Sequence, residues 1–186
     1  MPTYVSRPKG DFDPAPAGAH QAVCCDVVDL GRVTTSWQGK ERVVEMVQLR
    51  WQINEVNPKN DKRYLAVRRY TKSLGEKASL YKDLVSWRGR AFTENELQQF
   101  DLDTIIGVNC LVNIVHKEKD GTVYGNVNSV MPLPRGMQKI DVEDAYVMVR
   151  DRPPDQNGQQ RRPDDEPPGP DWGPDSEPSD DSTIPF

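Results

Sequence analysis

The stretch RYLAVRRYTKSLGEKASLYKDLVSWRG, residues 63–89, decides the fold, because the hydrophobic period changes inside it. Its first part, residues 63–71, alternates as a β-strand does, whereas the part after Ser73 follows a helical period. Ser73 and Glu76 match the capping box that starts a helix, and Gly89 is a suitable stop. The apolar positions at helical spacing are Leu74, Ala78, Tyr81, Leu84 and Val85. We therefore predict a strand followed directly by a helix.

Two further strands are expected before this stretch and two after it. The earlier pair covers residues 22–30 and 43–53, and the later pair covers 109–116 and 122–131. A second capping box at residues 93–96 predicts a short helix between the two groups. Three strands, a helical segment and two strands is the order of the oligonucleotide/oligosaccharide-binding fold, or OB-fold. We predict a mainly β protein: a five-stranded OB-fold barrel with a helical insert between strands three and four.

Proline content and charge divide the chain into three parts. Residues 20–136 carry the periodic pattern and form the predicted domain, while residues 1–19 contain four prolines and resemble a flexible arm. Residues 137–186 are expected to be a linker and a disordered acidic tail, because residues 151–186 hold nine of the 16 prolines and a net charge of −7. The whole chain carries −5, so residues 1–150 sum to +2 and are only mildly basic.

The last residues of this tail combine acidic and apolar side chains. Asp180 and Asp181 precede the apolar end Ile184, Pro185 and Phe186. An apolar end on a solvated arm has no core to join, so we interpret it as a protein-interaction tip that fits a pocket of another protein. The alternative is a frayed terminus without a role.

Alternation along the strands predicts which side chains face outward. Leu49, Trp51 and Ile53 share the core parity of the second strand, and Leu65 and Val67 are expected in the core of the third. The side chains predicted to face outward are Arg50, Tyr64, Arg68, Tyr70, Tyr124 and Asn126. Tyrosine rings can stack on bases and arginines can meet phosphates, so this face favours binding of a single nucleic-acid strand. The alternative is a soluble face with good β-propensity.

The predicted turns add candidates, because OB-fold ligands also lie under the loops between strands one and two and strands four and five. Trp37, Lys40 and Arg42 surround the first of these turns. Lys117 flanks the second, where Lys117 and Lys119 alternate with Glu118 and Asp120, a pattern that a solvated hairpin also explains. Trp87 adjoins the helical apolar stripe and is expected in the core.

Signals of catalysis, cofactors and membranes are missing from the sequence. The phosphate-binding Gly-x-x-x-x-Gly-Lys-Ser/Thr and the nucleophile motif Gly-x-Ser-x-Gly do not occur, so we do not expect an enzyme or a cofactor. Cys24, Cys25 and Cys110 lack metal-site spacing with the two histidines, and we read them as buried free thiols. The chain has no secretory signal or membrane span, which predicts a cytoplasmic protein.

Residues 69–80 and 87–93 resemble a family of phage and prophage single-stranded DNA-binding proteins, and residues 113–116 and 131–134 are similar to later segments of it. Separately, the tip resembles the C-terminal end of bacterial single-stranded DNA-binding proteins. The resemblance implies an OB-fold that coats exposed strands in replication, recombination and repair inside the bacterial host cell. It also implies a tip that recruits replication and repair enzymes, and it leaves open whether the chain forms a homo-oligomer. The alternative hypothesis is an OB-fold adaptor that binds other proteins and no nucleic acid.

Overall fold

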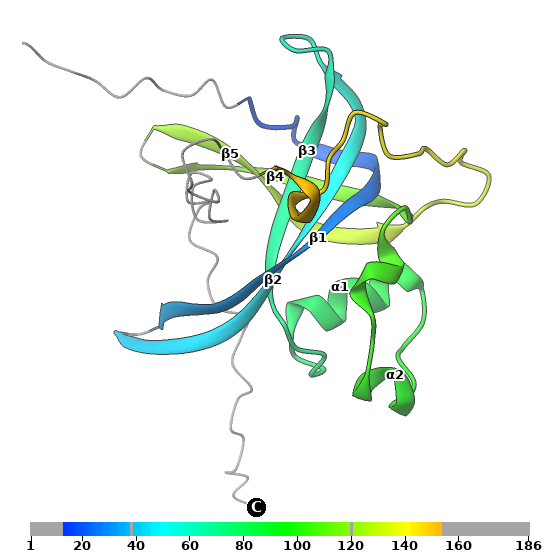
Figure 1. Ribbon diagram of the computed structural model, residues 1–186. Helices are drawn as coiled ribbons and strands as arrows, with labels where there is room; N and C mark the ends of the chain where they lie inside the picture. The colour runs from blue at the N-terminus through cyan, green and yellow to red at the C-terminus, as the bar shows by residue number, and fades with distance from the viewer. Residues whose placement is uncertain (1–12, 38, 120, 154–186) are drawn as a thin grey trace, which may run out of the picture.

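The computed structural model describes residues 13–37, 39–119 and 121–153, which fold around one five-stranded antiparallel sheet (Figure 1). The strands are β1 (Gly18–Trp37), β2 (Lys40–Asn57), β3 (Lys62–Thr71), β4 (Asn109–Lys119) and β5 (Thr122–Pro132), in the spatial order β3-β2-β1-β4-β5. All five predicted strands are present, and β1, β2 and β4 are longer than expected. The architecture is mainly β and OB-like.

The helical insert lies between β3 and β4, as predicted, and contains α1 (Ser79–Arg88), α2 (Glu94–Gln98) and the 3-10 turn η1 (Leu102–Ile105). The capping box of α2 is confirmed, because the Thr93 side chain accepts from the Glu96 amide and the Glu96 side chain accepts from the Thr93 amide. The box predicted at Ser73 is wrong. There the Ser73 hydroxyl accepts from the Gly75 amide at 3.2 Å, which makes a turn, and α1 begins only at Ser79. Gly89 ends α1 with a φ of 68°, as expected.

The sheet is not a closed barrel. Within the described residues, β3 and β5 are the two edge strands, and no ladder of backbone hydrogen bonds joins them. Helix α1 packs against both edges, and Arg68 Nη1 of β3 donates to the Asn128 carbonyl of β5 at 2.8 Å. Strands β3 and β5 approach each other without a ladder, and α1 and the Arg68 side chain bridge the opening between them.

The core lies between one face of the sheet and the helical insert. Trp51 is completely buried and its ring centroid is 6.1 Å from that of Trp87, so both tryptophans are in the core as predicted. The other large core residues are Val47, Leu49, Ile53, Tyr70, Leu80, Leu84, Val112, Ile114 and Val127. We call the face that carries the core strand residues the inner face of the sheet, and the opposite one the outer face.

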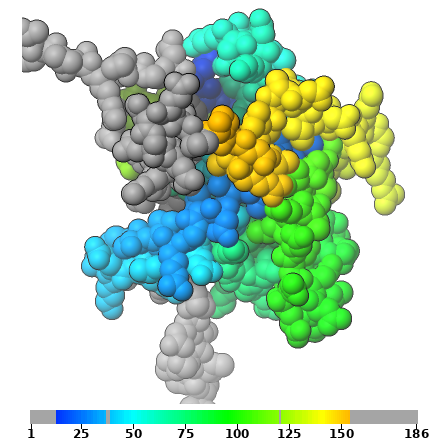
Figure 2. Space-filling view, in the orientation of Figure 1, coloured from blue at the N-terminus to red at the C-terminus, as the bar shows by residue number. Residues whose placement is uncertain are grey.

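Parts of the predicted arm and the predicted linker pack against the sheet. Ala15 is buried in the core, and its carbonyl accepts from His116 Nε2 at 2.7 Å. Residues 138–152, which we call the C-terminal strap, cross the outer face in front of β1 and β2 and end in the 3-10 turn η2 (Val149–Asp151) (Figures 1 and 2). The packed part of the chain therefore extends beyond the predicted range 20–136 at both ends. None of the helices in this described part has the length and hydrophobicity that crossing a bilayer requires.

Candidate nucleic-acid interface

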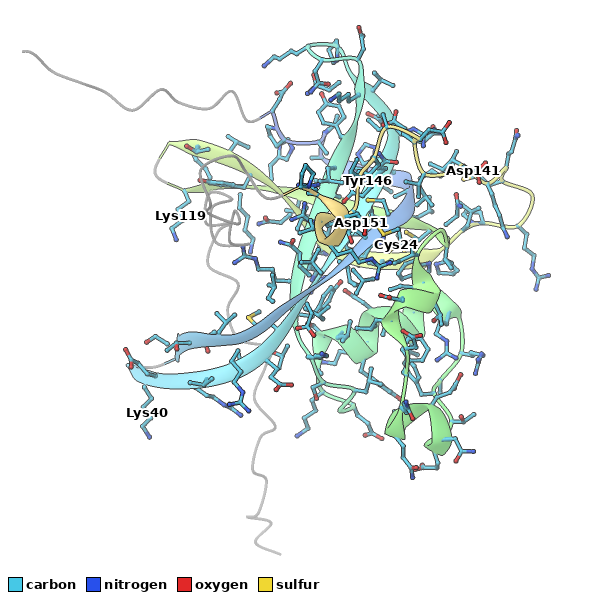
Figure 3. All side chains as sticks on the ribbon, viewed as in Figure 1. Cys24, Lys40, Lys119, Asp141, Tyr146 and Asp151 are labelled. Carbon is cyan, nitrogen blue, oxygen red and sulfur yellow. The ribbon has the colours of Figure 1, made fainter. Side chains whose placement is uncertain are left out.

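Two long hairpins extend beyond the core, and both reach the left side of the view in Figure 1. The first is the β1–β2 hairpin, in which the backbone of Trp37 pairs with Lys40 at the tip. The second is the β4–β5 hairpin, in which Lys119 pairs with Thr122. Figure 3 labels Lys40 and Lys119 at the two hairpin ends. These tips correspond to the two loops that are expected to contact a ligand.

In the β1–β2 hairpin, strand alternation places the basic and the acidic side chains of β2 on opposite faces. Strand β2 pairs without a bulge on its own side from Lys40 to Trp51, so Lys40 and Arg42 share the outer face with Arg50. Glu41 and Glu45 have the opposite parity and lie on the continuation of the inner face. Lys40 and Arg42 are both exposed. The outer face of this hairpin is therefore the cationic one.

In the β4–β5 hairpin, the basic side chains of β4 likewise lie on the outer face and the acidic one on the opposite face. Val112 and Ile114 are buried on the inner face, so Lys117 and Lys119 lie on the outer face and Glu118 on the opposite one. Lys117 pairs with Tyr124, which shares the outer face and is half-buried. Lys117 and Tyr124 are therefore neighbours on the outer face.

The root of the β1–β2 hairpin is fixed to β3 by an ion pair. Lys72 Nζ lies 2.6 Å from Asp29 Oδ2, and the Lys72 amide donates to the Glu45 carbonyl at 2.8 Å. The lysine lowers the pKa of the Asp29 carboxyl and the carboxylate raises the pKa of Lys72. Gly31 lies at the bulge beside this pair with a φ of 65°, and its amide donates to Asp29 Oδ1 at 2.9 Å. These contacts orient the hairpin where it leaves the sheet.

The outward orientation predicted for Tyr64, Arg68 and Tyr70 is wrong. These residues share the parity of Ala66, which is 2% exposed, and Tyr70 itself is 1% exposed. Tyr70 donates its hydroxyl to Asp83 Oδ2 of α1 at 2.7 Å, and Arg68 lies 2.9 Å from the same oxygen. Tyr64 packs against the core. Leu65 and Val67, which are predicted to be core residues, have the outer parity and are half-buried.

Arg50 and Asn126 lie on the predicted face but are buried. Arg50 is 4% exposed and its Nε donates to Gln48 Oε1 at 2.9 Å, while Asn126 is 7% exposed. Gln48 and Gln52, on the same face of β2, are 1% and 5% exposed. Alternation thus assigns these side chains to the correct face without revealing that the face has a second layer.

The C-terminal strap supplies that layer over part of β1, β2 and β4. Figure 3 shows Tyr146 and Asp151 in front of the strand that carries Cys24. The Tyr146 hydroxyl and the Val149 amide both donate to Asp26 Oδ2, at 3.0 and 2.8 Å. Asp26 is 1% exposed. The strap therefore supplies two hydrogen-bond donors to the buried Asp26 carboxylate, and a buried charge without such donors would be costly.

Gln52, Arg63 and Asn109 hold the first half of the strap. Gln52 exchanges two hydrogen bonds with Glu143, and Asn109 exchanges two with the backbone of Ile140. Arg63 Nη1 donates to the Asp141 carbonyl at 2.7 Å, and Arg63 Nε lies 3.9 Å from Glu143 Oε1. The strap is not among the predicted site residues, because a segment held by polar contacts carries no hydrophobic period.

Burial under this layer explains the titration of the nearest groups. It raises the pKa of the Cys25 thiol to about 12, and it raises the pKa of Tyr146 well above its usual range. Burial likewise raises the pKa of Cys24 and Cys110. All three thiols stay protonated at neutral pH and are poor nucleophiles. No cluster of three or more histidine, cysteine or acidic side chains suited to a metal ion occurs in the described part of the chain.

Some predicted residues lie outside the described part of the structure. These are the tip residues Asp180, Asp181, Ile184, Pro185 and Phe186, together with the side chain of Trp37. The sequence matches no protein-family model and no curated protein.

Proposed function

We propose that this protein is a non-catalytic single-stranded DNA-binding protein. One observation carries the proposal: the outer face of the two long hairpins carries Lys40, Arg42, Lys117 and Lys119, whereas Glu41, Glu45 and Glu118 lie on the opposite face. Lys40 and Arg42 represent this face on the first hairpin, and Lys117 with Tyr124 on the second. Sorted charge gives one cationic surface even though the domain is only mildly basic overall.

Each of these side chains has a role that suits a single strand. Lys40, Arg42 and Lys117 would neutralise phosphates, and the ring of Tyr124 would stack on a base. Trp37, at the tip of the first hairpin, is a second candidate for stacking. Tyr64, Arg68 and Tyr70 have no place in this interface, because they lie on the inner face.

A matched pair of variants on one hairpin tests the proposal. The double variant Lys40→Ala/Arg42→Ala removes two charges from the outer face, and Arg32→Ala removes one from the opposite face, where Arg32 pairs with Glu45. Titration with dT oligomers, followed by tryptophan fluorescence at several salt concentrations, gives the slope of log affinity against log salt. We expect the double variant to reduce this slope by about 0.7 for each phosphate that is no longer neutralised, and Arg32→Ala to leave it unchanged. Equal effects of the two would contradict the proposal.

We further propose that the tip residues Asp180, Asp181, Ile184, Pro185 and Phe186 recruit replication and repair enzymes in the cytoplasm of a bacterial host. The acidic tail would also compete with DNA for the basic surface. Removal of residues 176–186 should then tighten dT binding and abolish capture of those enzymes. If the truncation changes neither dT binding nor the capture of enzymes, the proposed role of the tail is wrong.

The second candidate function is a protein-interaction adaptor that binds no nucleic acid. The observation in its favour is that the C-terminal strap covers part of the outer face. Absence of any dT-dependent fluorescence change at low salt, in the full-length and tail-deleted proteins alike, would support the adaptor.

A further inference from the structure

The C-terminal strap covers a polar surface of the sheet. Asp26, Gln48, Arg50 and Gln52 are each 1% to 5% exposed on the outer face, although none is an apolar core residue. We propose that the strap is an intrachain occupant of the strand-binding face, and that a bound single strand lifts it off. This inference rests on the proposed function and adds a regulatory element to the same site.

The strap is attached in a way that suits release. None of its residues, 138–152, is itself buried, so the strap contributes no side chain to the core. The strands hold it by hydrogen bonds and one long ion pair, made by Gln21, Asp26, Gln52, Arg63 and Asn109. Arg150 of the strap makes a second ion pair, with Asp103 of η1 at 2.8 Å. Water or a polar ligand can replace such interactions, whereas apolar packing would have no substitute.

The strap presents acceptors to donors that a phosphodiester could use. The Glu143 carboxylate accepts from Gln52 Nε2 at 3.2 Å and faces Arg63, which also donates to the Asp141 carbonyl. A phosphate oxygen has the same charge sign and accepts from the same donor types. Exchange of Glu143 for a phosphate would therefore give the donors Gln52 Nε2 and Arg63 Nε a new acceptor, while Gln52 Oε1, which accepts from the Glu143 amide, would turn to water. Asp26, released from Tyr146, would offer an acceptor to the amino groups of bases.

The strap lies part-way along β1, between the two ends from which the hairpins extend. Strand β1 pairs with β4 from Gly18 to Val23 and forms the first hairpin at its other end, near Trp37. Because β1 and β4 are antiparallel, the β4–β5 hairpin leaves β4 beyond Gly18, at the opposite end of β1. The strap contacts β1 at Gln21 and Asp26, between these ends. A strand that follows β1 along the outer face from hairpin to hairpin meets the strap.

Three backbone amides of the strap report directly on its release. The amides of Ile140, Glu143 and Val149 donate to side-chain oxygens of Asn109, Gln52 and Asp26, at 2.9, 2.8 and 2.8 Å. Hydrogen exchange of the full-length protein, measured with and without a saturating dT oligomer, should show faster exchange at these three amides in the complex. Unchanged or stronger protection in the complex would overturn the inference.

A double variant tests the energetic side without changing the strands. Glu143→Gln removes the charge that faces Arg63, and Tyr146→Phe removes one donor to Asp26. The apparent affinity of a site that is open only part of the time scales with the open fraction. Loosening the strap should therefore tighten dT binding, by about 30-fold if each change weakens closure by a typical single interaction of about 1 kcal/mol. The matched control, Glu76→Gln with Tyr81→Phe, makes the same chemical changes away from the strap and should leave the affinity unchanged.

The outcomes separate this inference from the function on which it rests. If dT binds the wild type but the strap amides stay protected and the double variant binds no tighter, the strap is a permanent layer and the inference fails alone. If neither the wild type nor the double variant binds dT at low salt, the proposed function fails and the inference fails with it.

Discussion

The cluster of Tyr70, Arg68 and Asp83 bridges β3 and α1, and replacement of Asp83 by alanine tests how much it contributes. Asp83 Oδ2 accepts from the Tyr70 hydroxyl at 2.7 Å and lies 2.9 Å from Arg68 Nη1. Tyr70 is only 1% exposed, so its hydroxyl has little access to water once the carboxylate is gone. A buried donor left without an acceptor costs about 1–3 kcal/mol, and loss of the ion pair adds about 1 kcal/mol. We expect Asp83→Ala to lower the free energy of unfolding by about 3 kcal/mol.

Tyr70→Phe distinguishes a coupled pair from two independent residues. In the wild type it removes one hydrogen bond and should cost about 1 kcal/mol, because Asp83 keeps Arg68 as a partner. In the Asp83→Ala background the same change should be neutral or stabilising, since it deletes a hydroxyl that has already lost its acceptor. Urea unfolding of the four proteins, followed by tryptophan fluorescence, measures each free energy and therefore the coupling.

Two results would refute this reasoning. Equal losses from Tyr70→Phe in both backgrounds would mean that the hydroxyl and the carboxylate do not interact. The dT affinity of folded Tyr70→Phe should also equal that of the wild type, because Tyr70 lies on the inner face. If Tyr70→Phe bound dT several-fold more weakly at unchanged stability, Tyr70 would have to be part of the binding surface.

Three further predictions depend on single sites. A Cβ at Gly125 would lie 3.3 Å from the Ala15 carbonyl oxygen and 3.3 Å from Ile114 Cγ2, so Gly125→Ala should destabilise the fold by about 1 kcal/mol. Deleting residues 1–17 should reduce that loss in urea unfolding; an undiminished loss would locate the clash elsewhere. The pKa of Glu96 is lowered to about 2 by the Thr93 amide and by the guanidinium groups of Arg90 and Arg88. Because this folded-state pKa lies below the ordinary 4.5, its stabilisation is present above about pH 4.5 and is lost as the pH falls toward 2. An NMR titration midpoint for Glu96 near 4.5 would disprove the assignment. Lys117→Ala should weaken dT binding and reduce its salt slope, whereas Glu118→Gln, on the opposite face, should leave the slope unchanged; the reverse result would contradict the charge sorting.

The order of elements was predictable because each signal is local. The change from alternation to helical spacing near Ser73, the capping box of α2 and the stop at Gly89 all depend on residues within a few positions of one another. The false box at Ser73 fails for an equally local reason, because Gly75 and the Ser73 hydroxyl form a competing turn. The inner and outer faces of the second strand were also assigned correctly, because the large apolar residues Leu49, Trp51 and Ile53 share one parity and all three are buried.

The faces of β3 could not be assigned from its own residues. One parity holds Tyr64, Ala66, Arg68 and Tyr70, and the other holds Leu65, Val67 and Arg69, so each combines apolar and polar side chains. What decides between them is Asp83, 13 positions beyond Tyr70, which supplies the acceptor for its hydroxyl. Arg69 has the outer parity and pairs with Gln48, so the prediction that assigned the wrong face to β3 also missed Arg69.

The arrangement of hairpins and strap predicts how binding depends on the length of the strand. Lys40 and Lys119 lie at the tips of hairpins that leave opposite ends of β1, and the strap contacts the stretch between them. A short dT oligomer can occupy one hairpin while the Glu143 amide stays bonded to Gln52. An oligomer long enough to reach both hairpins along β1 has to displace the strap. Hydrogen exchange at Glu143 should therefore remain slow with short oligomers and accelerate above a threshold length, where affinity also rises. Acceleration by the shortest oligomer that binds would mean that the strand enters beneath the strap first, and that the hairpins are not the initial contact.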